Sequence, residues 1–490
     1  MSLENKRFPT MKDLEKDIIF QHFLQICQIP RKTYLEQGIS NYLFSWAKQR
    51  KLEVYQDEHW NLLIRKPASE GYEKRQGIIL QAHMDMVCEK SPEVRHDFLK
   101  DPIPLQLDGD FISTGNKTTL GADDGIGMAL AMTVLTEENL KHPPIDVIFT
   151  TAEEEDMSGA LAVDSSWFHT NRVINLDNSV DHEIIVGSSG GKGVEMKIPV
   201  ETILKPEGSH EYRITISGLT GGHSGEDIHK GLASANVLLG RLLSYMREKF
   251  SFYISEIQGG NFRLALAREA SVVVAISPED FSILQKSVAE FEHRIKTMYQ
   301  ETEKRIQIEI MEVTTKTEVF SKQFSEKIID TILLSPHGIS EMFGGLGVVE
   351  SSCNLGEIYR KEDSIFLVTE IRATFEENRE YIYEKIKILA RNIGASVREF
   401  ALYPSWIYQS HSKLQEAAKK VYQDLFQSSI KISVVHAGLE CGCFSSKIKN
   451  MDAISIGPNT WNLHSPHEKL SISSTYKVYQ FLTRLLEELE

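Results

Sequence analysis

Residues 77–86, GIILQAHMDM, carry the pattern from which the fold and the site can be inferred. Gly77–Ala82 is a short apolar run, which predicts a buried strand. His83 and Asp85 follow it two positions apart, so in extended backbone their side chains point to the same face. A carboxylate placed in this way can orient an imidazole that binds a metal ion.

Two further strand candidates follow, at Asp146–Thr151 and Val173–Leu176. Between the first strand and the second, small and apolar residues recur at helical spacing from about Ile126. A strand, a helix and a strand in this order predict parallel pairing, with the helix packed on the sheet. We therefore expect an α/β domain with a mostly parallel central sheet.

The pattern changes after Gly193, where alternating strands such as EYRITIS and SVVVAIS are interleaved with helices. This region predicts an inserted α+β domain, and a second set of similar elements indicates that the insertion could be doubled internally. From about Ser410 the first pattern returns. We expect a catalytic domain in two parts, residues 1–189 and 406–490, interrupted by a lid or dimerisation domain of residues 190–405. A chain of 490 residues also exceeds what one hydrophobic core supports.

The composition argues against several classes of protein. A formal net charge of -15 would repel a phosphate backbone, so we expect no nucleic-acid partner. The sequence has neither a run of about 18 apolar residues nor a signal-peptide pattern, so we expect a cytoplasmic protein without a membrane partner. Its 5 cysteines are an odd number spread thinly over the chain, which argues against a disulfide framework.

Residues that commonly bind metal ions stand at the ends of the expected elements: Asp123 before the helix, Glu153–Glu155 and Asp177 after strands, and His464 after the late strand AISIGP. Taken singly, these have ordinary explanations, because an acidic run favours a helix start and Asp-Asp-Gly favours a turn. Together they are hard to place by chance. The carboxyl ends of strands in an open parallel sheet converge on one crevice, where ligands bind.

Histidine and carboxylates without cysteine suit a catalytic zinc or manganese site better than a closed structural one. A carboxylate can bridge two ions about 3.5 to 4 Å apart, which leaves open positions for water and substrate. One glutamate of the acidic run can then bind metal while its neighbour accepts a proton from water. Charge alone does not decide which glutamate has which role. The prediction is metal-assisted hydrolysis.

These stretches, together with GLTGGHSGEDIHKG (218–231), HAGLECG (436–442) and HSPHEKL (464–470), resemble the co-catalytic zinc aminoacylase/carboxypeptidase family of metallopeptidases. Within that family the likeness is to aminoacyl-histidine (Xaa-His) dipeptidases, also called peptidase D or carnosinase-like, and it covers essentially the whole chain. It implies a zinc-peptidase-like α/β catalytic domain with an inserted lid. It also implies two divalent ions, zinc first and manganese or cobalt as alternatives, and small unblocked dipeptides such as Xaa-His as substrates.

The resemblance also implies a role for individual residues. The implied metal ligands are His83, Asp123 as the bridging carboxylate, Glu154, Asp177 and His464. Asp85 would orient His83, and Glu153 would be the general base. A shift of one residue in the alignment would make the functional pair Glu154 and Glu155. The Asp123-Asp124 peptide bond is expected to be cis, as is common in the family.

Other implied roles fall outside the metal ligands. His223 would stabilise the tetrahedral oxyanion, either from a partner subunit in a homodimer or within a monomer whose lid is doubled; as a polar loop residue before Ser224 it would look the same. Expected substrate-binding residues are His436, Glu440 and Arg372, although a helix start would also explain HAGLECG. Glu468 would either support His464 or only form part of its turn.

The sequence departs from the family in two places. RLALAREA (263–270) has Leu264 and Ala267 where the dipeptidases have asparagine and proline, and Ala152 replaces an acid before the glutamates. An aminoacylase or amidase acting on N-acyl amino acids would use the same metal ligands and is the alternative function. A catalytically silent binding protein is a second alternative. A phosphohydrolase would need basic phosphate clamps, which the motifs lack.

Overall fold

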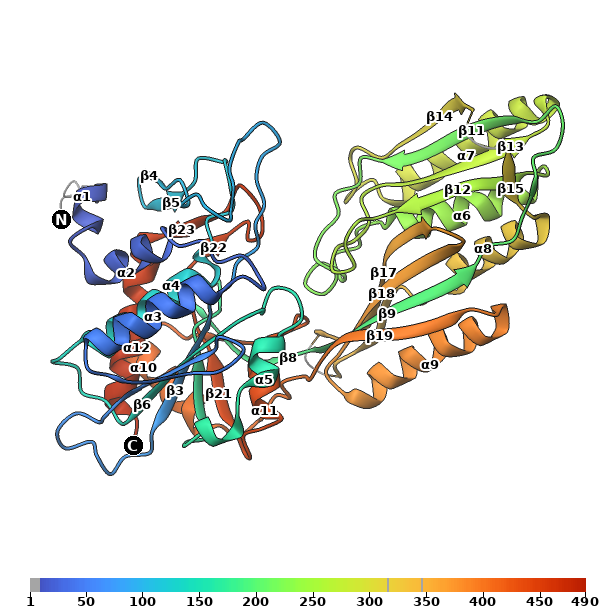
Figure 1. Ribbon diagram of the computed structural model, residues 1–490. Coiled ribbons are helices and arrows are strands. Elements are labelled where there is room, and N and C mark those ends of the chain that lie inside the picture. The colour runs from blue at the N-terminus through green and yellow to red at the C-terminus, as the bar shows by residue number, and fades with distance from the viewer. Residues whose placement is uncertain (1–8, 315–316, 345–346) are drawn as a thin grey trace. The chain divides into compact units, whose positions relative to one another are not determined.

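The computed structural model describes residues 9–314, 317–344 and 347–490, which form two compact units (Figure 1). The first unit comprises the described residues up to Ser188 together with Trp406–Val434 and Leu439–Glu490, and the second comprises Ser189–Ser405 and Val435–Gly438. The short segment Val435–Gly438 packs with the second unit, although the sequence grouped it with the first. The cause is local, because the Ser189 N–H donates to the carbonyls of Val435 and Ala437.

A mixed sheet forms the centre of the first unit. Its inner strands run parallel, in the order β6 (Ile145–Thr150), β3 (Ile78–His83), β7 (Arg172–Asn175) and β21 (Asp452–Ser455). Beyond them lie β2 (Leu62–Lys66) and β1 (Glu53–Gln56) on one side, and β8 (Glu183–Ser188) and β20 (Lys431–Val435) on the other. Every residue of β3 and β6 is buried, as expected for central parallel strands covered on both faces. The α/β prediction is confirmed.

The longer helices that share one hydrophobic core with this sheet are α2 (Ile18–Ile26), α3 (Gln37–Gln49), α4 (Ala122–Thr136), α10 (Lys413–Phe426) and α12 (Ile472–Glu488). Helix α4 is buried around almost its whole circumference because it contacts both β3 and α2. The shorter helices of this unit are α1 (Met11–Leu14), α5 (Ser158–Ala162), η1 (Ser165–Trp167) and α11 (Cys441–Ser445). Within the described part of the chain, no helix is long and apolar enough to cross a membrane.

A small antiparallel sheet joins a late segment of the chain to the segment before α4. Its strands lie in the order β22 (Thr460–Trp461), β23 (Lys469–Ser471), β5 (Phe111–Ser113) and β4 (Gln106–Asp108). His464 lies in the loop between β22 and β23. It is therefore presented by this small sheet and does not directly follow the central strand β21.

The second unit contains two modules with the same chain order. The first module runs β11 (His210–Ser217), α6 (Ala235–Arg247), β12 (Tyr253–Gly259), β13 (Ala270–Ile276), η2 (Pro278–Asp280), α7 (Phe281–Met298) and β14 (Gln307–Val313). Its strands pair in the order β14-β11-β13-β12. The succession strand, helix, strand, strand, helix, strand is typical of ferredoxin-like units.

The second module repeats this succession around the first. It runs β9 (Gly190–Pro199), α8 (Lys322–Leu334), β17 (Val349–Lys361), β18 (Ser364–Ala373), α9 (Glu376–Ile393) and β19 (Ser396–Tyr403), paired in the order β19-β9-β18-β17. The first module is inserted between β9 and α8, and the two sheets join where β12 pairs with β17. Short strands β10 (Thr202–Leu204), β15 (Glu318–Phe320) and β16 (Gly338–Met342) complete the unit. The topology therefore doubles one α+β module without a visible sequence repeat.

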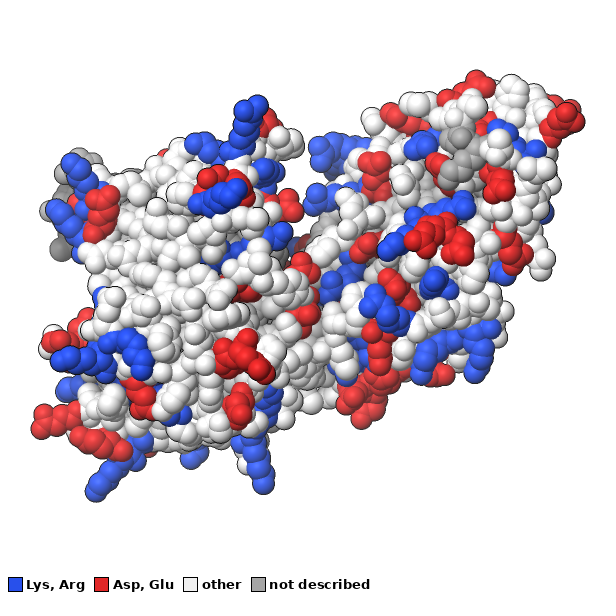
Figure 2. All heavy atoms as spheres, in the orientation of Figure 1, with Lys and Arg blue, Asp and Glu red and all other residues white. Residues whose placement is uncertain are grey.

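On the face drawn in Figure 2, basic and acidic side chains are interspersed over each unit. Neither sign forms a single continuous patch on this face.

Candidate metal centre

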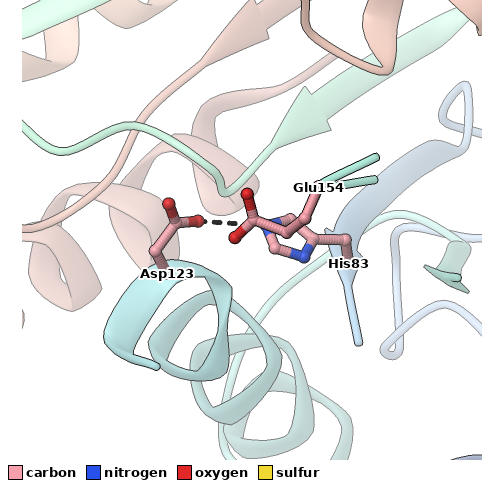
Figure 3. A group of neighbouring side chains, drawn as sticks. All are labelled: His83, Asp123 and Glu154. Atoms are coloured by element: carbon pink, nitrogen blue, oxygen red, sulfur yellow. Dashed lines mark hydrogen bonds and ion pairs between the residues drawn. The ribbon is translucent and has the colours of Figure 1, made fainter. Parts of the chain in front are cut away.

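The five residues expected to bind metal lie in the first unit, in the region where β3, β6 and β7 end. His83 is the last residue of β3, Asp123 lies in the first turn of α4, and Glu154 lies in the loop after β6. Asp177 follows β7, and His464 comes from the β22–β23 loop. Figure 3 shows His83, Asp123 and Glu154 pointing toward one another. One ligand atom from each of these three residues lies within 4.8 Å of the other two.

The two oxygens of Asp123 face two different histidines. Asp123 Oδ1 lies 3.0 Å from His83 Nε2, and Asp123 Oδ2 lies 3.2 Å from His464 Nε2. A further carboxylate lies beside each imidazole: Asp177 Oδ1 is 4.0 Å from His83 Nε2, and Glu154 Oε2 is 3.0 Å from His464 Nε2. The arrangement therefore has two sides, with Asp123 between them.

The donor atoms fit a divalent metal ion. Two imidazoles and three carboxylates form the set that catalytic zinc and manganese sites use. Glu154 Oε1 is buried without a hydrogen-bond partner among the described residues, which is costly unless a cation binds there. The group of neighbouring side chains that could hold the ion, found among the described residues, includes no cysteine. These residues can hold a metal ion.

The electrostatics of the cluster also favour a bound cation. Burial alone would lower the pKa of His83, but Asp123 and Asp85 outweigh burial and raise that pKa well above its usual value. Burial would raise the pKa of Asp123, but His464 and His83 lower it well below its usual value. For Asp177, burial and the charge of Asp123 both raise the pKa. Acidic side chains packed this closely are stabilised by any cation among them.

Asp85 connects the β3 end to the loop that carries the glutamates. Its Oδ1 lies 3.4 Å from His83 Nδ1, on the side of the ring away from Asp123. The same carboxylate accepts hydrogen bonds from the Glu153 and Glu154 N–H groups, both at 3.1 Å, and from Thr33 Oγ1 at 2.9 Å. Asp85 therefore fixes the backbone of the acidic loop as well as facing the imidazole, and the sequence indicated only the second contact.

The acidic run contributes its first two glutamates to the cluster. Glu154 lies with the other candidate ligands, whereas Glu155 is exposed. Burial, together with the charges of Glu154, Glu440 and Asp123, raises the pKa of Glu153 well above its usual value, although His83 opposes this. The geometry therefore favours Glu153 and Glu154 over the pair shifted by one residue. The Asp123-Asp124 peptide bond is cis, as expected.

A second cluster lies within the second unit and is positively charged. His223, in the loop after β11, has its Nε2 3.2 Å from Arg372 Nη2 on β18. Arg372 also donates to the Tyr403 hydroxyl at 2.8 Å and to Ser224 Oγ at 3.2 Å. The Arg372 side chain is buried, and the Glu370 carboxylate, which also accepts from the Tyr403 hydroxyl at 3.4 Å, pairs with Arg263. His436 belongs to the same unit, with its Nε2 2.7 Å from Ser352 Oγ.

Glu440, expected among the substrate-binding residues, is buried against the central strands. The residue is 0% exposed, and its carboxylate accepts hydrogen bonds from Thr150 Oγ1 on β6, at 2.7 Å, and from Gln81 on β3. Burial raises its pKa to about 7. Glu440 is therefore a support behind the strand ends, which its position at the start of α11 did not indicate.

Sequence reasoning gave no firm role to Glu468 and none to Arg31, and both lie against the Asp123 turn. The Glu468 carboxylate accepts hydrogen bonds from backbone N–H groups at the start of α4. Arg31 donates to backbone carbonyls of the same turn and of the β3 end. Backbone partners of this kind leave no side-chain pattern, so only the position of Glu468 in HSPHEKL gave a signal.

Comparison with known proteins identifies relatives along the whole chain. A model of peptidase family M20/M25/M40 matches residues 79–488. The cytosol non-specific dipeptidase of Escherichia coli (strain K12) is 34% identical over 480 residues, which cover 98% of this chain and 99% of that protein. The crystal structure of aminoacylhistidine dipeptidase from Vibrio alginolyticus matches with a TM-score of 0.81 and 33% identity, covering 98% of both chains. Aminopeptidase PepT from Bacillus cereus ATCC 10987, at 17% identity and a TM-score of 0.55, covers 96% of this chain and 98% of its own and shares the fold.

Proposed function

The chain belongs to peptidase family M20/M25/M40, and from this premise we propose that it is a metal-dependent dipeptidase acting on Xaa-His and related unblocked dipeptides. Two relatives that match over 98% of the chain support this, because one is named a non-specific dipeptidase and the other an aminoacylhistidine dipeptidase. They favour peptide substrates over the N-acyl amino acids of an aminoacylase. The cytosolic relative also supports a cytoplasmic location.

The observation that carries the proposal is the position of Asp123 between two histidines. We infer a centre of two divalent ions, with zinc as the expected metal. His83 and Asp177 would hold one ion, Glu154 and His464 the other, and Asp123 would bridge both. When bound, such ions polarise a scissile carbonyl and lower the pKa of a water molecule.

Glu153 is the proposed general base. It is adjacent to the ligand Glu154, and Asp85 accepts hydrogen bonds from the backbone of both residues, so the loop that presents them is fixed. Glu153 would take the proton from the attacking water and give it to the leaving amine. General acid-base catalysis of this kind requires the carboxylate within hydrogen-bond reach of the water.

The cluster of the second unit is proposed to act on negative charge of the substrate. Arg372 brings a buried positive charge next to His223, which suits an oxyanion or the free carboxylate of a dipeptide. His436 would contribute from the same cluster. His223 would act either within its own chain, with the doubled unit as a lid, or from a second copy in a homodimer. Mixing Glu153→Gln with His223→Ala separates these, since only exchange between chains restores activity.

A substrate panel tests the proposed function. The purified protein is loaded with Zn²⁺ and assayed on β-Ala-His, Gly-His, dipeptides without histidine, and N-acetyl amino acids. We expect hydrolysis of the dipeptides and little or none of the N-acetyl compounds. Faster hydrolysis of N-acetyl amino acids would make the protein an aminoacylase. Absence of turnover on every substrate, with metal bound, would favour a binding role.

A further inference from the structure

The N-terminus of α4 is capped by the carboxylate of Glu468, a residue distant in sequence. Helices begin with N–H groups that lack partners within the helix, and a Ser, Thr, Asp or Asn side chain at the N-cap usually satisfies them. Here the N-cap is Gly121, which has no side chain. Glu468 supplies the acceptors instead. Its two oxygens accept from the N–H groups of Leu120, Gly121, Ala122 and Asp123, at 2.8, 3.0, 2.8 and 3.4 Å.

Arg31 holds the same turn from its carbonyl side. Its guanidinium donates to the carbonyl of Gly121 and, at 2.9 and 2.7 Å, to the carbonyls of Met84 and Asp85. These last two residues directly follow His83, so one side chain connects the end of β3 to the start of α4. Arg31 and Glu468 are each 2% exposed. Their contacts are therefore shielded from water. Hydrogen bonds to charged groups are stronger in such an interior than in water.

The backbone fits closely around these side chains. Gly121 has a φ of 68°, and a Cβ there would lie 2.5 Å from Arg31 Nη2 and 2.8 Å from Met86 Sδ. A side chain at position 121 would therefore displace the guanidinium. Gly125, one turn later, is under the same restriction, with a Cβ 2.8 Å from Arg31 Nη2. The turn has little room in which to shift.

Two candidate ligands from distant parts of the chain depend on these contacts. Glu468 lies four residues after His464 in the β22–β23 loop, and it binds the backbone amide of Asp123 itself. Any movement of Glu468 changes the position of His464 relative to Asp123. Catalytic groups must be held within about 0.5 Å of the productive geometry by the residues around them.

We propose that Glu468 and Arg31 are positioning residues that hold the Asp123 carboxylate in place for two metal ions, which rests on the metal ligands of the proposed function. Glu468 sets Asp123 relative to His464, and Arg31 sets Asp123 relative to His83. Neither residue is proposed to touch metal or substrate. Their effect is therefore expected on metal affinity and on kcat, with little change in KM.

The test compares Glu468→Gln with a matched control, Asp452→Asn. Glutamine keeps the size of the side chain but points an amide NH₂ at N–H groups that need acceptors. Asp452 is a carboxylate of the same unit that accepts from Leu414 N–H at the start of α10, away from the candidate ligands. Both variants and the wild type are stripped of metal and titrated with Co²⁺. Binding is measured by isothermal titration calorimetry and by the visible absorption of bound cobalt. Thermal unfolding is measured with and without Zn²⁺.

We expect Glu468→Gln to lower the affinity for at least one Co²⁺ by about 10- to 100-fold, to alter the cobalt spectrum, and to shrink the Zn²⁺-induced rise in melting temperature. Asp452→Asn should lower both melting temperatures equally and leave the rise unchanged. If Glu468→Gln behaves like Asp452→Asn, Glu468 is merely structural and the proposal is overturned. If Glu468→Gln does not fold, Arg31→Lys, which cannot span three carbonyls, is judged by the same criteria.

The wild-type titration separates this inference from the function on which it rests. Wild-type protein that binds fewer than two Co²⁺ contradicts the two-ion centre itself. Wild-type protein that binds two, with unchanged affinities in Glu468→Gln and Arg31→Lys, contradicts only the positioning role.

Discussion

Two buried histidines, one in each unit, are shifted in opposite directions. Burial lowers the pKa of both. Around His83, the carboxylates of Asp123 and Asp85 overcome burial and raise the pKa well above 6.5. Around His436, burial and the nearby Arg372 act together and lower the pKa to about 3. The charge of the neighbours decides the result, so one cluster suits cations and the other suits anions.

Of the tests of this contrast, metal removal has the largest expected effect. A chelator should abolish activity, because the carboxylates of the first cluster would lose the cations that join them. Binding of each ion at about 1,000 times its Kd stabilises the fold by about 4 kcal/mol, so the melting temperature should fall as well. Activity and melting temperature are measured before and after Zn²⁺ is restored. Full activity in protein shown by elemental analysis to be free of metal would contradict the role of the first cluster.

Replacing the proposed base, Glu153, has the next largest expected effect. Glu153→Gln should reduce kcat by about 10²- to 10⁴-fold, since the amide cannot accept the proton from water. The neighbouring ligand Glu154 is untouched, so two equivalents of metal should remain bound. Glu155→Gln, at the exposed end of the same run, is the control and should keep wild-type kcat. Comparable kcat for Glu153→Gln and the control would disprove the assignment.

The positive cluster is tested by removing its charge. Arg372→Gln should lower kcat/KM by about 10²-fold, because a preorganised charge next to His223 would be lost. Metal content should not change, which separates this cluster from the first. Arg398→Gln, an exposed arginine of the same unit paired with Glu195, is the control. Loss of metal from Arg372→Gln would mean that the two clusters are not chemically distinct.

The smallest expected effect is on the pH dependence of stability. His436 has a folded-state pKa of about 3, below the usual 6.5, so the unfolded chain binds its proton more tightly. The stability that this residue contributes is complete above pH 6.5 and is lost as the pH falls toward 3. Between pH 6.5 and pH 5 the loss is about 2 kcal/mol. The free energy of unfolding of His436→Asn should fall correspondingly less between the two pH values, as measured by urea unfolding. Equal decreases in the variant and the wild type would contradict the lowered pKa of His436.

The sequence itself contains a physical reason for the residues of the first cluster to converge, whereas those of the second were expected only from the family resemblance. His83, Asp123, Glu154 and Asp177 each stand at or near the end of a strand or the start of a helix, and parallel strands bring those ends together. Arg372, on β18, reaches His223, in the loop after β11, only through the strand order of the second unit, which brings together segments far apart in sequence. Neither hydrophobic periodicity nor a local motif encodes that order.

The buried residues that support the strand ends also left no sign in the sequence. Glu440 precedes a short helix and could have lined a pocket, but its contacts are Thr150 and Gln81 on neighbouring strands. The doubling of the second unit left no sequence repeat, because the two modules share strand order without sharing residues. The strands and helices themselves were recovered closely, since their periodicity is local: the expected strand 77–82 is observed at 78–83.

The small sheet that carries His464 has a consequence for how the chain is assembled during synthesis. His83, Asp123, Glu154 and Asp177 leave the ribosome before the main segment of the second unit, whereas His464 and Glu468 leave it after that segment. Until β23 pairs with β5, the start of α4 lacks its acceptor and the acidic cluster lacks its second imidazole. The β22–β23 segment thus completes the centre, and α12 directly after it completes the hydrophobic core that covers the central strands.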